Sequence, residues 1–174
     1  MVINEDSKGL LKEIECYALD MDGTIYLGEQ WSEGAREVLA KLKTAGKTYI
    51  FLTNNSSKSP LAYVEKLERM GLSIEQKQVI TSGQATIHYL KKQYLNKKVF
   101  LLGNPILKRE FEEAGIPLAE EGAEVAVTAF DTSLDYQKMC RICDLVRQGI
   151  PYIGTHPDYN CPTETGFIPD IGAI

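Results

Sequence analysis

Short apolar runs alternate along this chain with amphipathic stretches whose apolar residues recur with a period of about 3.6. Runs that are rich in β-branched or aromatic side chains and end at polar turns are typical of buried strands. The strands that this pattern predicts lie at residues 16–19, 49–52, 79–81, 99–102, 125–127 and 152–154. Because strand and helix signals alternate, we expect an α/β fold built on parallel sheets.

Helix signals fill the intervals between these runs. In most of them a Ser, Asn or Asp that can cap the first turn precedes the apolar stripe, and a glycine follows it. The predicted helices begin at Ser32, Ser59-Pro60, Gln84, Asn104-Pro105 and Asp135, and all but the third end at a glycine, namely Gly46, Gly71, Gly115 and Gly149. The third is expected to end near Tyr94.

Two of the helical stripes lead to specific expectations. The first predicted helix should bury Ala35, Val38, Leu39 and Leu42. On the last one, Met139, Ile142, Cys143 and Val146 fall at helical spacing, which predicts that Cys143 is buried. Cys140 and Cys143 also have the spacing of a redox or metal motif, but no second Cys or His pair completes a zinc site, so packing is the preferred interpretation.

Composition narrows the class of protein. The chain has 174 residues, of which 44% are hydrophobic and 25% charged, values typical of a soluble globular protein with one large or two small domains. The net charge of −5 disfavours nucleic acid and anionic membrane as partners. No apolar run is long enough to span a bilayer and no secretory signal is present, so we expect a cytoplasmic location with reduced cysteines.

A pair of carboxylates stands where the first predicted strand ends, in Asp20-Met21-Asp22-Gly23-Thr24. Successive side chains of a strand point to opposite faces, so Asp20 and Asp22 converge only if the chain leaves the strand between them. Gly23 permits that bend, and the N–H groups of the turn, at Met21 and Gly23, can then face a phosphate. One carboxylate could attack phosphorus while the other handles the proton of the leaving group. The plain alternative is a strand that runs into a polar turn.

A second polar segment, Thr53-Asn54-Asn55-Ser56-Ser57, follows the second predicted strand. In open α/β sheets, ligands bind beyond the carboxyl ends of the strands, where these hydroxyls and amides would suit phosphate oxygens. Alone, such a segment is more often an ordinary turn. Beside the carboxylate pair, the phosphate-binding interpretation is preferred.

Residues 20–26 together with residues 53–57 resemble the haloacid dehalogenase (HAD) superfamily, most closely its NagD-like and p-nitrophenyl phosphatase subgroup. Residues 155–158 and 162–166 are similar to the cap domain of that subgroup. The resemblance implies a Rossmann-like core with a parallel sheet and an α/β cap inserted after the third core strand. Residues 1–82 would be the first half of the core and residues 83–174 a nearly complete cap, in a chain truncated at its C-terminus.

The resemblance also implies Mg²⁺-dependent hydrolysis of small phosphate monoesters through an aspartyl-phosphate. Asp20 would be the nucleophile, and Asp22 would protonate the leaving alcohol and then activate water. The Asp20 carboxylate and the Asp22 backbone carbonyl would be Mg²⁺ ligands, consistent with the preference of this cation for oxygen. Thr53 and Asn54, with Asn55, would bind the phosphoryl oxygens.

Three residues beyond the last predicted strand, His156, Asp158 and Tyr159, are candidates for contacts to the leaving group of a small phosphorylated metabolite. A solvated surface turn is an equally good interpretation of this segment. The aromatic residues Tyr26 and Trp31 are expected to pack against the nearby helix. The resemblance makes a homodimer through the cap plausible.

Members of this family carry two further motifs after the cap, a lysine and an acidic pair, and neither can be assigned to a residue of this chain. Whether the chain is active alone is therefore left open. The alternative from another class is a non-catalytic HAD domain that binds phosphate or Mg²⁺, or serves only an interaction role. A different nucleotide-binding α/β protein is least favoured, because G-x-G-x-x-G and P-loop patterns are absent from the sequence.

Overall fold

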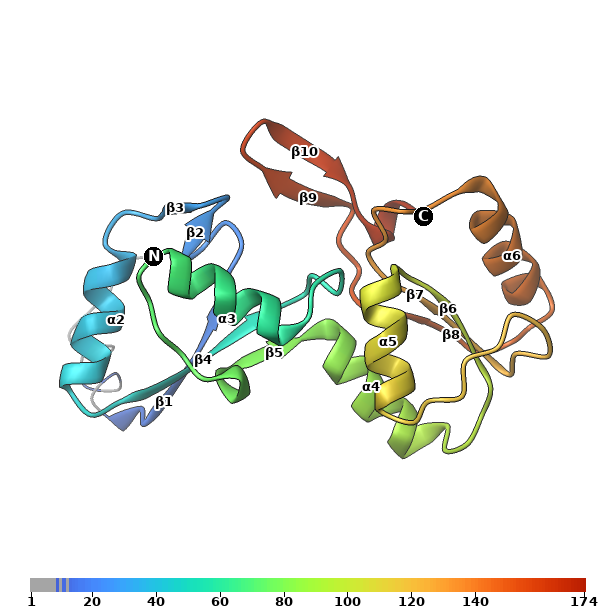
Figure 1. Cartoon of the computed structure of the whole chain (residues 1–174), viewed down its shortest axis with the longest axis horizontal. Helices are drawn as coiled ribbons and strands as arrows, with labels where there is room; N and C mark the ends of the chain where they lie inside the picture. The colour runs from blue at the N-terminus through green and yellow to red at the C-terminus, as the bar shows by residue number, and fades with distance from the viewer. Residues whose placement is uncertain (1–8, 10, 12) are drawn as a thin grey trace.

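A computed structural model describes residues 9, 11 and 13–174, which form two α/β lobes (Figure 1). The N-terminal lobe, residues 13–81, and the C-terminal lobe, residues 82–174, each contain a three-stranded sheet, with strand orders β1-β4-β5 and β6-β7-β8. All four strand pairings in these two sheets are parallel, which confirms the predicted α/β class.

In the N-terminal lobe, the described helices cover one face of the sheet and leave the other face bare. Helices α2 and α3 bury Leu39, Tyr63 and Leu67 against Phe51 and Val79 in one apolar cluster. The opposite face presents apolar side chains to solvent. The elements of this lobe are β1 (Cys16–Asp20), β2 (Tyr26–Leu27), β3 (Gln30–Trp31), α2 (Ala35–Thr44), β4 (Thr48–Thr53), α3 (Pro60–Arg69), the 3₁₀ helix η1 (Gln76–Gln78) and β5 (Val79–Thr81).

Strand β1 differs from the buried strand that its sequence predicts. Cys16, Ala18 and Asp20 are exposed. Within the described residues β1 pairs only with β4, so it is an edge strand, and its outward side chains point to the bare face of the sheet. On the same face Leu52 and Ile80 remain 40% and 38% exposed.

The C-terminal lobe has three layers. Strands β6 and β7 are buried along their whole length, with α4 and α5 covering one face and α6 the other. A hairpin and a short 3₁₀ helix follow the third strand. The elements are α4 (Ser82–Gln93), β6 (Val99–Leu102), α5 (Pro105–Glu113), β7 (Val125–Thr128), α6 (Tyr136–Arg147), β8 (Tyr152–Gly154), β9 (Asn160–Thr163), β10 (Gly166–Pro169) and η2 (Ile171–Ala173).

Several helix predictions are confirmed at their first residue and two are not. Ser59, Asn104 and Asp135 cap α3, α5 and α6 through their side chains. Helix α2 instead starts after Gly34, and α4 starts two residues early because Thr81 and Gln84 form a reciprocal capping box.

The apolar stripes were predicted too wide. Val38 is 50% exposed, and Cys143 is exposed rather than buried. On α6 the residues that reach the sheet are Ile142 and Leu145, and Cys143 faces the open side of the lobe beside β8. Tyr26 is fully buried and Trp31 packs against the same cluster, as expected.

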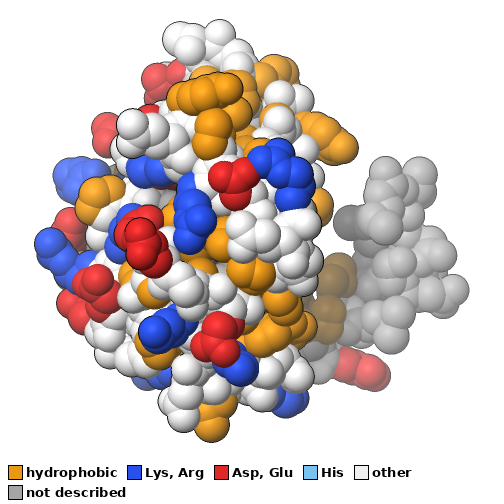
Figure 2. All heavy atoms as spheres, turned by 90° about the vertical axis from the view of Figure 1, so that its right-hand side faces the viewer, with side chains coloured by type: hydrophobic (Ala, Val, Ile, Leu, Met, Phe, Trp, Pro, Cys, Tyr) orange, Lys and Arg blue, Asp and Glu red, His pale blue; other side chains and the backbone are white. Residues whose placement is uncertain are grey.

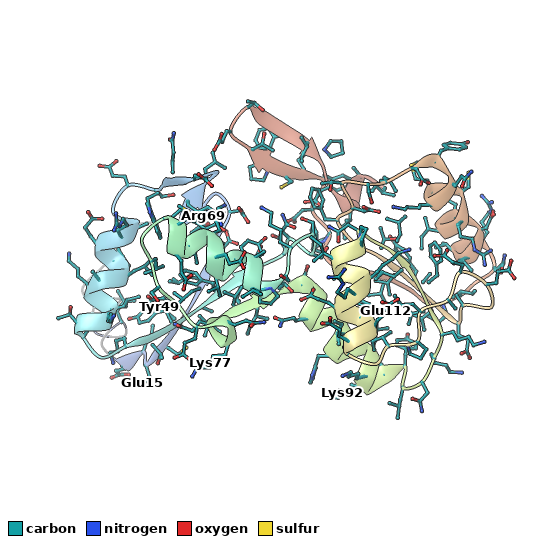
Figure 3. All side chains as sticks on the ribbon, viewed as in Figure 1. Glu15, Tyr49, Arg69, Lys77, Lys92 and Glu112 are labelled. Carbon is teal, nitrogen blue, oxygen red and sulfur yellow. The ribbon has the colours of Figure 1, made fainter. Side chains whose placement is uncertain are left out.

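The two lobes face each other across the carboxyl ends of β1, β4 and β5. Glu15 and Tyr49, near the beginnings of β1 and β4, lie at the end of the N-terminal lobe remote from the C-terminal lobe (Figure 3). The hairpin of β9 and β10 extends from the C-terminal lobe toward β2 and β3 (Figure 1). The strand ends therefore open onto the junction between the lobes.

On the face of the molecule shown in Figure 2, neither positive nor negative side chains dominate. Lys and Arg side chains are interspersed there with Asp and Glu and with apolar groups (Figure 2). Among the described residues, no helix is long and apolar enough to cross a membrane.

Candidate active site

The loop after β1 turns back on itself immediately after Asp20, the last residue of the strand, and carries Asp22. The carbonyl of Met21 accepts hydrogen bonds from the N–H groups of Thr24, Ile25 and Tyr26, at 3.2, 2.9 and 3.3 Å. Gly23 has φ +84°, a left-handed conformation that suits glycine, and its N–H donates to the Tyr26 carbonyl at 2.8 Å. The side chain of Met21 is fully buried in the apolar cluster, so only its main chain can face a ligand.

Asp20 and Asp22 lie in different environments. Asp20 is exposed, and its Oδ2 accepts a hydrogen bond from the Thr24 hydroxyl at 2.6 Å. Asp22 Oδ1 lies 3.9 Å from Lys66 Nζ, whereas its Oδ2 is buried without a hydrogen-bond partner among the described residues. Burial raises the pKa of the Asp22 carboxyl, and the charges of Lys66 and Lys58 offset part of that rise. Asp22 therefore holds a proton more readily than an ordinary aspartate.

Lys66 was not predicted to belong to this site. It lies on the buried face of α3, three residues after Tyr63, and its Nζ lies 3.7 Å from the centre of the Tyr26 ring. Burial lowers the pKa of Lys66, and Asp22 opposes that change. The sequence does hold a signal, because a lysine at this spacing interrupts the apolar stripe of its helix.

The loop after β4 uses most of its polar groups internally. Thr53 is buried, and its hydroxyl accepts the Asn55 N–H at 3.2 Å. The Asn55 side-chain oxygen accepts both the N–H and the hydroxyl of Ser57, at 2.8 and 2.7 Å. Of the three residues predicted to bind phosphoryl oxygens here, Asn54 alone is exposed.

Residues 54–57 also form the junction between the lobes, a role that was not predicted from the sequence. The hydroxyl of Ser56 accepts the Phe130 N–H at 3.0 Å and lies 3.4 Å from the Thr155 hydroxyl. The Ser57 carbonyl accepts the Asn104 side-chain amide at 2.8 Å. In addition, the Asn54 amide donates to Asp158 Oδ2, which brings a predicted phosphate ligand and a predicted leaving-group contact together.

His156 was expected to contact the leaving group, but its side chain does not line this junction. Its Nε2 lies 2.8 Å from Asp170 Oδ1 and its Nδ1 lies 3.2 Å from the Thr155 hydroxyl, and the side chain is only 4% exposed. Both ring nitrogens are therefore engaged inside the C-terminal lobe. These contacts allow His156 to stabilise the segment that carries Asp158.

Tyr159 is also placed elsewhere. It is 70% exposed and lines a cavity of about 970 Å³ beside α6 and β8. Within the described part of the chain, every residue that lines this cavity belongs to the C-terminal lobe. Of the three predicted leaving-group residues, the structure brings only Asp158 to the strand ends.

The β9–β10 hairpin covers the first loop. Pro162 lies close to Gly23, with its Cγ 3.8 Å from the position that a Cβ would take. The side chain of Glu164 occupies the space over Gly28 where a Cβ would stand. Burial raises the pKa of the Cys161 thiol, and Asp170 and Asp22 add to that rise. The hairpin thus forms a roof above the loop that follows β1.

The sequence and the fold are similar to those of known proteins. Residues 17–117 match the haloacid dehalogenase-like hydrolase family. An acid sugar phosphatase of Staphylococcus aureus is 34% identical over 165 residues, 94% of this chain and 64% of the relative. This chain therefore spans about two thirds, or slightly less, of the length of the curated relatives it matches.

Two solved structures show how closely the fold is shared. The 4-nitrophenylphosphatase of Thermotoga maritima is 42% identical with a TM-score of 0.89, over 94% of this chain and 63% of that one. A glycerol phosphate phosphatase of Mycobacterium tuberculosis, solved in complex with magnesium, is 25% identical with a TM-score of 0.84, over 93% and 50%. The chain belongs to the haloacid dehalogenase-like hydrolase family.

Proposed function

We propose that this chain carries the nucleophile, the acid/base and part of the phosphate site of a Mg²⁺-dependent phosphatase for small phosphate monoesters. The observation that supports it most directly is the arrangement of Asp20, Asp22 and Asn54 at adjacent strand ends under a roof from the second lobe. Family membership and the names of the relatives point the same way. By the same proposal, residues 1–82 are the first half of the catalytic core and residues 83–174 are its cap.

The reaction would take place in two displacements. The Asp20 carboxylate attacks phosphorus, forming an aspartyl-phosphate while the ester P–O bond breaks and the leaving oxygen takes the proton of Asp22. Asp22 then removes a proton from water, whose oxygen attacks phosphorus and releases phosphate and Asp20. The raised pKa of Asp22 fits the first of its two roles. Asn54 would donate to a phosphoryl oxygen, and Thr53 would support that loop.

The residues at the strand ends offer oxygen donors that suit Mg²⁺. The Asp20 carboxylate and the Asp22 carbonyl would hold the ion, which usually keeps several waters. When bound, Mg²⁺ offsets the repulsion between a carboxylate and a phosphate dianion. Among the described residues, no cluster of three or more His, Cys, Asp or Glu is placed to hold a metal ion, so these two residues supply only part of a coordination shell.

That observation favours a second candidate function for the chain by itself. With only part of a metal site, the chain could bind phosphate and Mg²⁺ without hydrolysing esters. The two candidates differ in turnover and agree on binding.

The test is Mg²⁺-dependent hydrolysis of p-nitrophenyl phosphate by the chain and by Asp20→Asn, with calorimetric titration of inorganic phosphate. Asp144→Asn, on the exposed side of α6, is the matched control. Hydrolysis that falls about a thousandfold or more in Asp20→Asn supports the phosphatase. Mg²⁺-dependent phosphate binding without turnover supports the second candidate, and the absence of both refutes the two together.

We also propose a cytoplasmic location, supported by the four cysteines, all in the described part of the chain, which are free thiols. Association of two copies through the C-terminal lobe and the lack of nucleic-acid or membrane partners stay predictions. Sedimentation velocity would test the first of them.

A further inference from the structure

Lys66 carries a positive charge into the apolar side of α3. It lies between Val64 and Leu67 in the sequence, both of which belong to the apolar cluster, and its side chain is only 11% exposed. Taking an ammonium group out of water costs free energy unless partners compensate. A lysine at the edge of a core usually extends its stem so that the amine reaches water. Here the amine faces inward, which indicates that partners inside the lobe hold it.

Two contacts hold the Lys66 amine at the loop that follows β1. Its Nζ lies 3.7 Å from the centre of the Tyr26 ring, a cation–π contact, and 3.9 Å from Asp22 Oδ1. Tyr26 is itself fixed to that loop, because its carbonyl accepts the Gly23 N–H at 2.8 Å and its N–H donates to the Met21 carbonyl at 3.3 Å. The amine is therefore held beside Asp22 by the same loop that carries this carboxylate.

Within the described part of the chain, the Asp22 side chain has no other hydrogen-bond or ion-pair partner. Its Oδ2 is buried without a hydrogen bond, whereas the Asp20 carboxylate is fixed by the Thr24 hydroxyl at 2.6 Å. Lys58 adds positive charge from the exposed loop before α3, but among these residues it forms no ion pair with Asp22. Lys66 is thus the side chain that can determine which way the Asp22 carboxyl group faces.

The direction of this carboxyl group matters for the proposed reaction. An acid assists the departure of an alcohol only when its proton lies within hydrogen-bond reach of the leaving oxygen. The side chain of an aspartate rotates about two bonds, and each unproductive orientation lowers the fraction of molecules in which the proton can be transferred. A contact that fixes the orientation therefore stabilises the transition state, and it contributes little to the binding of the phosphoryl group itself.

We propose, on the basis of the function proposed above, that Lys66 is a positioning residue for the acid/base Asp22. By holding Oδ1 of Asp22 beside its amine, Lys66 keeps the carboxyl group in the orientation that serves the leaving oxygen. It does not touch the substrate, and its contribution passes through Asp22. The alternative is a purely structural residue whose stem fills the space between α3 and Tyr26.

The experiment compares two oxyanions that would bind the same site, each titrated by calorimetry into the chain with Mg²⁺. Inorganic phosphate is tetrahedral and would contact the phosphate site alone. Orthovanadate accepts a fifth oxygen ligand and then resembles the transition state, in which the leaving oxygen contacts the acid. We expect the unmodified chain to bind vanadate about tenfold tighter than phosphate, because a hydrogen bond from an oriented acid stabilises only the vanadate complex.

Lys66→Met removes the charge and keeps an unbranched apolar stem that can pack in the same space. It should lower the affinity for vanadate about tenfold and the affinity for phosphate no more than about twofold. Lys66→Arg keeps the charge and should retain most of the preference for vanadate. Arg69→Met is the matched control, because it removes a cation from the exposed last residue of the same helix (Figure 3). It should leave the ratio of the two affinities unchanged, since a distant charge acts on both anions alike.

A double variant tests whether Lys66 acts through Asp22. In Asp22→Asn, which cannot supply the proton, adding Lys66→Met should leave the ratio of the two affinities unchanged. Three results overturn this inference while phosphate binding leaves the proposed function standing: equal affinities for the two oxyanions in the unmodified chain, equal losses for both in Lys66→Met, and a selective loss that persists in the Asp22→Asn background. Failure of both oxyanions to bind the unmodified chain overturns the two proposals together.

Discussion

Replacing Ser56 tests most directly whether a buried hydrogen bond holds the two lobes together. Ser56 is 1% exposed, and its hydroxyl accepts the N–H of Phe130, a residue at the end of the β7 segment that is itself buried. In Ser56→Ala that N–H would lose its acceptor in a place that water does not reach. A buried donor left without a partner costs about 1–3 kcal/mol, so we expect a loss of about 2 kcal/mol in the free energy of unfolding.

Ser82→Ala is the matched control, because it deletes the same atom from a second bond between the lobes. The Ser82 hydroxyl donates to the Asn54 carbonyl at 2.6 Å, but that bond is exposed. Water can replace it, and the change should stay within about 0.5 kcal/mol.

Urea denaturation gives the two free energies, and hydrogen exchange with peptide mass mapping reports the Phe130 amide directly. In Ser56→Ala the peptide that contains Phe130 should exchange faster, whereas in Ser82→Ala it should not. Losses of equal size in both variants, or a loss below about 0.5 kcal/mol in Ser56→Ala, would refute the idea that this buried bond couples the lobes.

Three further predictions concern the site and its support. Asp22→Asn should slow hydrolysis of an alkyl phosphate more than that of p-nitrophenyl phosphate, because a poor leaving group needs the proton; equal losses would exclude Asp22 as the acid. Burial acts to raise the pKa of Asp131, but hydrogen bonds from Lys138 and Ser133 outweigh it and hold that pKa below its usual range. The ion pair between Asp131 and Lys138 therefore stabilises the fold above about pH 4 and is lost on further acidification. Lys138→Met should therefore cost about 3 kcal/mol at pH 7, and thermal melts should show the difference shrinking as the pH falls below about 4; a constant difference would contradict this. Gly172→Ala should displace the segment below Asp158, visible as a shifted Asn54 side-chain amide signal by NMR, and an unshifted signal would show that the loop accommodates the methyl group.

Local patterns predicted the strands of the two parallel sheets and the helices that cover them, because these elements depend on neighbouring residues. They did not predict the two hairpins, β2–β3 and β9–β10. The capping of α3, α5 and α6 by Ser59, Asn104 and Asp135 needed only the three residues that follow each cap. The polar segments at the ends of β1 and β4 were equally visible, since parallel strands bring their carboxyl ends to one edge.

What the sequence did not predict depends on partners far along the chain. Cys143 and Ile142 are equally apolar, and only the position of the sheet decides which of them is covered. His156 is hydrogen-bonded to Asp170, and a pairing of this kind leaves no periodic pattern in the sequence. The exposure of β1 has the same origin, because an apolar run cannot show how many neighbouring strands it has.

The bonds from residues 54–57 to the C-terminal lobe have a consequence for how this protein can change over generations. Because Asn54, Ser56 and Ser57 are each hydrogen-bonded to that lobe, substitutions at Asn104 or near Phe130 would displace the loop that follows β4. The far end of the β9–β10 hairpin, where Phe167 is 76% exposed, makes no hydrogen bond to the N-terminal lobe within the described residues, although the Glu164 side chain lies against Gly28. Insertions and substitutions should therefore accumulate at the tip of the hairpin, whereas the residues that join the two lobes should change together or not at all.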